Sequence, residues 1–379
     1  MKAPFPWFGG KSRIAPVVWQ ALGDVPGFIE PFCGSGAVLL NRPAPEAGSR
    51  RVETINDMDG LVCNFWRAVK DDPAEVAHYA DWPVVENDLH ARHMWLVERK
   101  DTLQERLEGD PDFYDAKAAG WWVWGMACWI GGEFCSGKGP WKIVRKDSVR
   151  QLVHLGDAGM GVNRQRVHLG DAGMGVNRRR VHLGNAGRGV NRKLVHLSDA
   201  GMGVNRVRVN LSDAGMGDPG NGECGLRAWM AALAHRFNRV RVCCGDWRRI
   251  CGGRSGDALR HFFACGEPCG VFLDPPYSAE AGRDETIYRR ESLTVAHDVR
   301  EWAVRHGNDR RLRIVLCGYN GEHKMPRGWR EMAWKSSSGY SMLDKTGNGV
   351  GKNNRHRERI WLSPHCLPVS GARAVGRRR

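Results

Sequence analysis

The sequence has no apolar run long enough to cross a lipid bilayer. Its most apolar segment, AGWWVWGMACWIGG from Ala119, is shorter than the roughly 20 residues that a transmembrane helix needs. The opening residues, MKAPFPWFGGKS, have neither the apolar stretch nor the small-residue cleavage site of a secretory signal peptide. We therefore expect a cytoplasmic protein without a membrane partner.

The 12 cysteines lack the paired spacing of a zinc site. The closest approaches are Cys243-Cys244 and Cys265-x-x-x-Cys269, and neither has a second pair at a ligand spacing. We expect no bound metal, and we interpret the cysteines as reduced and mostly buried thiols.

Acidic side chains are fewer than basic ones. There are 57 Lys and Arg against 42 Asp and Glu, which gives a net charge of +15. Because phosphate contacts supply most of the sequence-independent affinity for nucleic acids, this excess favours a polyanionic partner. A merely basic surface is the alternative.

Strand and helix patterns alternate at both ends of the 379-residue chain. The segments GFIEPF, VETIND, RVRVCC, GVFLDPP, LRIVLCG and ERIWLS are typical of buried strands. SRIAPVVWQALG is typical of a helix with a cap-like Ser12, an early Pro16 and an end at Gly23. The alternation predicts one parallel-rich α/β domain from residues 1–60 and 236–379, interrupted by an inserted middle region.

The middle region, residues 61–235, begins with helical patterns and continues into a tryptophan-rich segment and a repeat. VHLGDAGMGVNR recurs with a period of 14 residues over 153–217. The first four copies carry Arg or Lys with Asn and His, which contact phosphates and base edges, so we expect at least one copy to face DNA. The alternative is a recent tandem duplication whose extra copies loop out of the fold. Four tryptophans are interpreted as core residues in preference to base wedges: Trp121, Trp122, Trp124 and Trp129.

A glycine turn, Glu30-Pro31-Phe32-Cys33-Gly34-Ser35-Gly36, joins a predicted strand to the helical AVLLN. Glycines let the backbone turn tightly and approach a ligand, so a nucleotide-like ligand and a plain turn are both consistent with it. The segment does not end in the Gly-Lys-Ser/Thr of a Walker loop. The next strand ends in Asn56-Asp57, where an acid either takes ribose hydroxyls or caps the following helix.

The stretch LDPPY places Asp274, Pro275, Pro276 and Tyr277 directly after an apolar run. Prolines that close together end a strand, because they cannot donate to a sheet. An ordinary strand-terminating turn and an active-site corner are both consistent with this pattern.

Four motifs follow one another along the chain: Trp-Phe-Gly-Gly-Lys at 7–11, EPFCGSG, IND at 55–57 and DPPY. In this order they resemble the adenine-specific DNA methyltransferases of the alpha group, the Dam-like or D12 class. The resemblance covers the α/β parts and is weak across the middle, from which we assign no residue roles. It implies a Rossmann-like class I methyltransferase sheet that binds S-adenosylmethionine, with 61–235 as an inserted, partly helical target-recognition region.

The resemblance also implies which residues hold the cofactor. Trp7 and Lys11 would cover S-adenosylmethionine and bind its carboxylate, and Asp57 would hold the ribose. The turn under the methionine moiety consists of Pro31, Cys33, Gly34, Ser35 and Gly36. CCGDW resembles the segment that holds the cofactor adenine, with Asp246 accepting from the amine and Trp247 packing beside it. A corner that only caps the next helix is the alternative.

For DPPY, the resemblance implies that the carboxylate of Asp274 and the carbonyl of Pro275 each accept one N6–H of adenine, which localises the lone pair on nitrogen. Pro275 and Pro276 fix the direction of the carbonyl, because their φ is locked. Tyr277 would stack on the target base, which must leave the duplex to be reached. Asp274 would also contact the cofactor amino group. Cytosine-N4 enzymes usually carry Ser in place of this Asp, so Asp274 favours adenine.

We therefore predict a site-specific methyltransferase that acts on adenine N6 in double-stranded DNA by base flipping. With no nuclease domain visible, we expect an orphan or phage/prophage-type enzyme, associated with the nucleoid through DNA. The sequence leaves open whether it is a homodimer and whether a restriction nuclease is encoded elsewhere. The alternatives are cytosine-N4 DNA or RNA adenine methylation, and a catalytically silent DNA-binding protein on the same fold.

Overall fold

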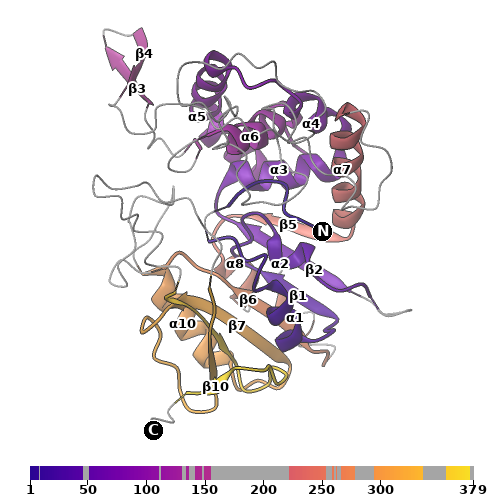
Figure 1. The fold of residues 1–379 in the computed structure, drawn as a ribbon, viewed down its shortest axis with the longest axis vertical. Coiled ribbons are helices and arrows are strands. Elements are labelled where there is room, and N and C mark those ends of the chain that lie inside the picture. The colour runs from indigo at the N-terminus through magenta and orange to yellow at the C-terminus, as the bar shows by residue number, and fades with distance from the viewer. Residues whose placement is uncertain are drawn as a thin grey trace, which may run out of the picture. The chain divides into compact units, whose positions relative to one another are not determined.

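The computed structural model divides into two compact units (Figure 1). The residues that it describes are 1–7, 9–45, 51–110, 112–129, 134–135, 141–146, 149–154, 222–252, 258–259, 262, 266–277, 294–335 and 356–375. The predicted repeats lie outside the described residues from 155 onward. We call Met1–Pro6, Ala68–Arg99 and Tyr114–His235 the helical unit, and Trp7–Arg67, Lys100–Phe113 and Arg236–Arg379 the sheet unit.

In the part of the sheet unit that the structure describes, eight strands form one sheet in the order β10-β8-β9-β7-β6-β1-β2-β5. The strands are β1 Gly27–Glu30, β2 Val52–Asp57, β5 Val240–Cys244, β6 Cys269–Leu273, β7 Leu312–Tyr319, β8 Arg330–Ala333, β9 Glu358–Leu362 and β10 Arg373–Ala374. The five adjacent strands β7, β6, β1, β2 and β5 are parallel to one another. Strands β9, β8 and β10 are each antiparallel to their neighbours. Every strand predicted from the sequence forms, and the mixed α/β architecture fits a methyltransferase fold.

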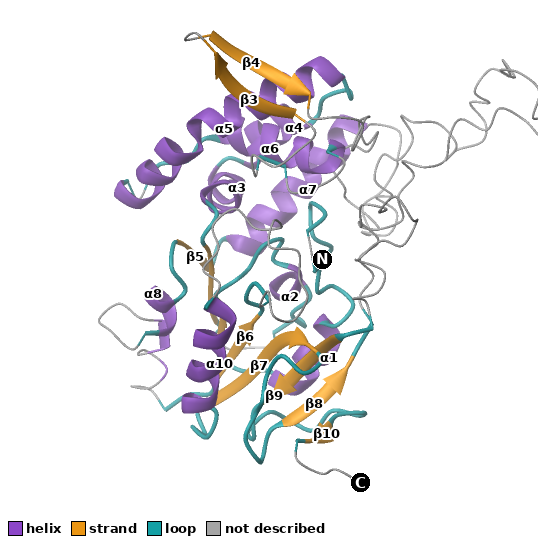
Figure 2. Ribbon diagram, turned by 90° about the vertical axis from the view of Figure 1, so that its left-hand side faces the viewer, coloured by secondary structure: helices purple, strands orange, loops and turns teal. Residues whose placement is uncertain are grey.

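The helices of the sheet unit cover both faces of the sheet. They are α1 Ala15–Leu22, α2 Ala37–Leu40, α8 Arg248–Cys251 and α10 Val295–His306. Val271 of β6 and Ile314 of β7 belong to the same buried cluster as Val299 of α10. Phe28 of β1 points to the other face, where its ring centroid lies 4.7 Å from that of Trp19 of α1. Figure 2 shows α10 and α1 on either side of the strands.

Helix α1 begins later than the sequence predicts. Its N-cap is Ile14, without a side-chain cap, so the predicted cap at Ser12 is wrong. The carbonyl of Lys11 instead accepts the N–H groups of Ile14 and Ala15, at 3.1 and 2.9 Å, which makes residues 11–14 a turn that leads into the helix. Pro16 in the first turn and Gly23 at the end are as predicted. The turn fixes the backbone of Lys11.

The helical unit contains α4 Pro73–Ala80, α6 Ala116–Cys128 and a hairpin of β3 Trp141–Lys146 and β4 Val149–His154. Helices α3 Gly60–Asp71, α5 Glu86–Gly109 and α7 Gly222–Phe237 contribute residues to both units. Trp122, Trp124 and Trp129 are buried, which confirms their predicted core role, whereas Trp121 is half-buried. None of the described helices is both long and apolar enough to cross a membrane.

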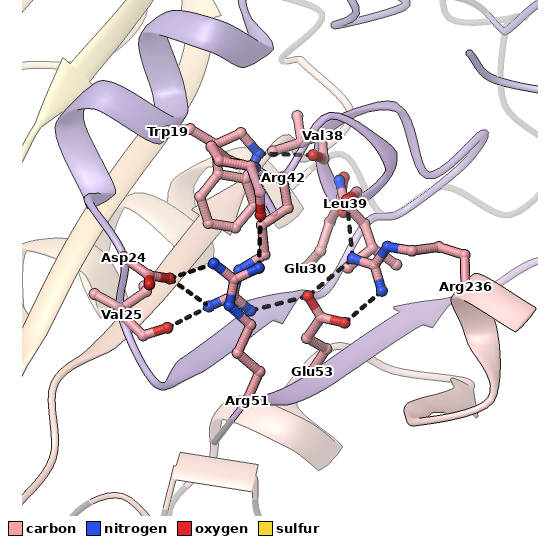
Figure 3. A network of polar contacts seen from close by, with 12 residues as sticks. Trp19, Asp24, Val25, Glu30, Val38, Leu39, Arg42, Arg51, Glu53 and Arg236 are labelled. Carbon is pink, nitrogen blue, oxygen red and sulfur yellow. Dashed lines mark hydrogen bonds and ion pairs between the residues drawn. The ribbon is translucent and has the colours of Figure 1, made fainter. Parts of the chain in front are cut away.

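Glu53, near the start of β2, is buried between two guanidinium groups (Figure 3). Arg42 Nη1 donates to its Oε1 at 2.9 Å, and Arg236 donates to both oxygens, at 2.6 and 2.9 Å. Arg42 also donates to the carbonyl of Val25, and Arg236 donates to that of Leu39 at 3.1 Å. The network therefore ties β2 to the segments around α1 and α2 and to the last turn of α7.

Candidate active site

The strand order of the sheet reverses between β1 and β6. β1 pairs in parallel with β2 on one side and with β6 on the other. The segments that follow β1 and β6 therefore leave the same edge of the sheet in opposite directions, and ligands of open α/β sheets bind at such points. The glycine turn 31–36 follows β1, and Asp274 to Tyr277 follow β6, as predicted from the sequence.

The turn after β1 brings bare backbone against the ring of Trp7. Gly34 has φ +45° and Gly36 has φ +63°, backbone conformations that residues other than glycine rarely adopt. A Cβ added at Gly34 would lie 2.2 Å from Nε1 of Trp7. The predicted turn residues are all buried: Pro31, Cys33, Gly34, Ser35 and Gly36. Trp7 and the turn are thus brought together as the sequence predicts.

Asp57, at the end of β2, holds this turn. Its Oδ2 accepts the N–H of Gly34 at 2.9 Å, and its Oδ1 accepts the N–H of Asp59 at 3.0 Å. Burial raises the pKa of Asp57 to about 6. The helix that follows is capped by Asp59, whose Oδ1 accepts the N–H of Leu61 at 2.8 Å. Asp57 therefore sits beside the glycine turn and leaves the capping role to its neighbour.

Asp274 forms an ion pair that the sequence did not predict. Its Oδ2 lies 2.8 Å from Nζ of Lys11, which also donates to the carbonyl of Gly9 at 2.8 Å. Burial disfavours the charged ammonium, but the carboxylates of Asp274 and Glu358 outweigh it and raise the pKa of Lys11. An ammonium has three N–H groups, so these two partners leave one for a ligand. The thiol of Cys317, whose pKa is raised by burial and by Asp274, is a further weak donor to this carboxylate.

Tyr277 is held by two residues that sequence reasoning missed. Its hydroxyl donates to Oε2 of Glu358 at 2.8 Å, and Oδ1 of Asp274 lies farther away at 3.4 Å. Its ring meets that of Tyr319 edge-to-face, with centroids 4.6 Å apart. Lys11 Nζ lies 5.4 Å from the ring centroid. The available signal was the acid that begins the strand ERIWL, two residues before its apolar run Ile360–Leu362.

Asp246 and Trp247, which follow β5, have local structural partners. Asp246 Oδ1 accepts the N–H of Arg248 at 2.8 Å, which is the capping alternative, and its side chain is 42% exposed. Trp247 is buried in the core, with ring centroids 6.3 Å from Phe32 and 6.4 Å from Trp302. Contacts of either residue with a cofactor adenine stay a prediction.

The residues at these strand ends fit S-adenosylmethionine, the predicted cofactor. The glycine turn has no side chain at Gly34, where the ring of Trp7 lies against the backbone and a Cβ would displace it. Lys11 Nζ could donate to the methionine carboxylate, and the carboxylate of Asp57 has lone pairs that could accept from a ribose hydroxyl. Asp246 is exposed enough to accept from an amine. Their strands β1, β2 and β5 are neighbours in the sheet, in the order of methionine, ribose and adenine.

The comparison with known families agrees with this site. Residues 7–102 match the family model of the D12 class N6 adenine-specific DNA methyltransferases, whereas a comparison with curated proteins finds no match. The matched range contains Trp7, Lys11, the glycine turn and Asp57, and it ends before DPPY. The family methylates adenine in DNA with S-adenosylmethionine as methyl donor. Over residues 7–102, the chain is therefore similar to the D12 class of N6 adenine-specific DNA methyltransferases.

Proposed function

We propose that this protein transfers a methyl group from S-adenosylmethionine to N6 of adenine in double-stranded DNA. The proposal rests above all on Asp274, which follows β6 at the point where the strand order reverses and lies 2.8 Å from Lys11. The family match at residues 7–102 supports the cofactor and the base.

The chemistry requires acceptors for the amino hydrogens, because the lone pair of adenine N6 is delocalised into the ring. Asp274 Oδ1 and the carbonyl of Pro275 each accept one N6–H, and nitrogen regains a directed lone pair. Pro276 and Pro275 hold the corner rigid, since the proline ring locks φ. S-adenosylmethionine, when bound, supplies an electrophilic sulfonium methyl group. Most of the acceleration then comes from positioning and from preorganised charge.

The remaining parts of the proposal concern the DNA. A base inside a duplex cannot reach the DPPY corner, so the target adenine is flipped out and stacked on Tyr277. The region 61–235 recognises the target site, and 1–60 with 236–379 bind the cofactor. The enzyme is an orphan or phage/prophage-type methyltransferase that works on DNA in the cytoplasm.

Transfer of tritiated methyl groups tests the proposal. The protein is incubated with tritiated S-adenosylmethionine and either duplex DNA or RNA that contains adenine. We expect label in the DNA and none in the RNA. Label in the RNA alone would favour the RNA methyltransferase alternative, and no label in either would favour a silent DNA-binding protein.

Replacing Gly34 with Ala is expected to weaken S-adenosylmethionine binding at least tenfold. The new Cβ would lie 2.2 Å from Trp7 Nε1, so the ring must leave the turn. Gly266→Ala is the matched control, because Gly266 also has a positive φ, +68°, but a Cβ added there meets no atom of the described residues within 4 Å. Calorimetric titration of both variants measures the effect. Equal affinities would contradict the predicted cradle.

Affinity for S-adenosylmethionine is expected to fall below pH about 6. Burial raises the pKa of Asp57 to about 6, so its carboxylate is ionised above this pH and protonated below it. The ionised form is the better acceptor for a ribose hydroxyl, and affinity should drop by up to about tenfold per pH unit below the pKa. Titrations between pH 5 and 7.5 check this, with Asp57→Asn as the variant that should lose the dependence. A flat wild-type profile would remove Asp57 from the ribose site.

A further inference from the structure

Glu358 is a buried acid beside the proposed catalytic corner, and the proposed chemistry gives it no task. It opens β9, where it pairs with Tyr319 of β7, and it is 4% exposed. Its carbonyl also accepts the N–H of Trp334 at 3.2 Å. Strands on both sides of β9 fix the backbone of Glu358, so the position of its carboxylate is set by the sheet.

The hydroxyl of Tyr277 has two carboxylates within reach. Glu358 Oε2 lies at 2.8 Å and Asp274 Oδ1 lies at 3.4 Å. A phenol has one hydrogen and donates it to one strong acceptor, here the nearer Glu358. If Glu358 lost its oxygens, Asp274 Oδ1 would be, of these two carboxylates, the acceptor left to this hydroxyl.

The two oxygens of Asp274 are not equivalent. Oδ2 is 2.8 Å from the ammonium of Lys11, which leaves Oδ1 as the better acceptor for an amino hydrogen of the base. A phenol bound at Oδ1 would compete with that hydrogen and withdraw negative charge from the oxygen. The phenol must therefore be kept on another acceptor.

We propose that Glu358 is a positioning residue, which takes the hydrogen of the Tyr277 hydroxyl at 2.8 Å and so directs it away from Asp274 Oδ1, the acceptor of the target amine. This inference rests on the proposed function. It predicts that the loss of kcat on replacing Glu358 requires the hydroxyl of Tyr277 and does not require any other part of that side chain. Edge-to-face contact with Tyr319 keeps the ring in place when the hydroxyl is removed.

A double-mutant cycle tests the proposal with variants of similar size. Glu358→Met removes the acceptor, Glu358→Gln keeps one oxygen, and Tyr277→Phe removes the hydroxyl. With Tyr277 present, Glu358→Met should lower kcat for DNA methylation roughly tenfold to a hundredfold, as expected for a misdirected hydrogen bond to a charged group. Glu358→Gln should retain kcat within about threefold. In the Tyr277→Phe background, Glu358→Met should change kcat by less than about threefold, because no hydroxyl remains to be redirected.

Lys11 keeps the nearer carboxylate, Asp274, in every variant. The Kd for S-adenosylmethionine should therefore change by less than about threefold across the cycle, which separates positioning from a damaged fold. If Glu358→Met unfolds the protein, Glu358→Ala takes its place. Equal losses in the Tyr277 and Phe backgrounds would overturn the positioning role and leave the proposed function intact. Wild-type protein that labels no DNA would overturn both.

Discussion

Replacing Asp274 with Asn is expected to lower kcat for adenine methylation about a thousandfold, the upper range for removing one preorganised charge contact at a reacting centre. The amide keeps one acceptor oxygen, but it loses the charge that localises the lone pair on N6. It also presents an NH2 group either to the ammonium of Lys11 or to the target amine, and both are donors. Single-turnover transfer of tritiated methyl groups to duplex DNA, at saturating cofactor, measures this step.

Asp309→Asn is the control for this substitution. Asp309 pairs with Arg311 at 2.7 Å. It lies outside the DPPY motif and outside the strands that carry the site residues. Its replacement should leave kcat unchanged. If Asp274→Asn keeps more than about a tenth of the wild-type kcat, the carboxylate is not the main acceptor for N6–H.

Replacing Glu53 with Ala is expected to lower the free energy of unfolding by about 3–5 kcal/mol, the usual cost of breaking a buried ion pair. Glu53 is 5% exposed, and the substitution removes the carboxylate that both Arg42 and Arg236 contact. The side chain of Arg42 is 1% exposed, so water cannot replace the lost carboxylate, and its remaining carboxylate partner, Asp24, lies farther away at 3.7 Å. A loss of this size corresponds to a fall in melting temperature of roughly 10 °C.

Glu331→Ala supplies the comparison for this stability prediction. Glu331 pairs with Arg359 at 3.2 Å, but its side chain is 37% exposed. Exposed pairs contribute about 0–1 kcal/mol, so this variant should unfold near the wild-type temperature. Thermal and urea denaturation of both variants decides the matter. Similar melting temperatures for the two variants would show that the Glu53 network does not stabilise the fold.

The parallel core of the sheet could be predicted because buried strands are continuous apolar runs between glycine and proline signals. β6 and β7 are of this kind, and both form as expected. β8, with the sequence REMA, was missed, since it is short and has no buried run. The start of α1 was misplaced for a different reason. Ser12 is a good cap by type, but the carbonyl of Lys11 receives the first N–H groups of the turn, and this hydrogen bonding leaves no local sequence signal.

The part of the site that could be predicted from the sequence consists of motifs at the ends of neighbouring parallel strands. Such ends meet at one edge, which places the turn after β1 beside Asp57 and the DPPY corner. Glu358 and Tyr319 could not be found in this way. Glu358 reaches Tyr277 through the antiparallel pairing of β9 with β7, and a single sequence does not specify this register. Tyr319 ends β7, the parallel neighbour of β6, but no motif marks it.

Nucleoside analysis of duplex DNA methylated by this protein is the most direct test of the central claim. The DNA is digested after incubation with tritiated S-adenosylmethionine, and the labelled nucleosides are separated. We expect the label in N6-methyladenine with wild-type protein, and its loss with Asp274→Asn. Label in N4-methylcytosine would contradict the assignment of Asp274 to the amine of adenine.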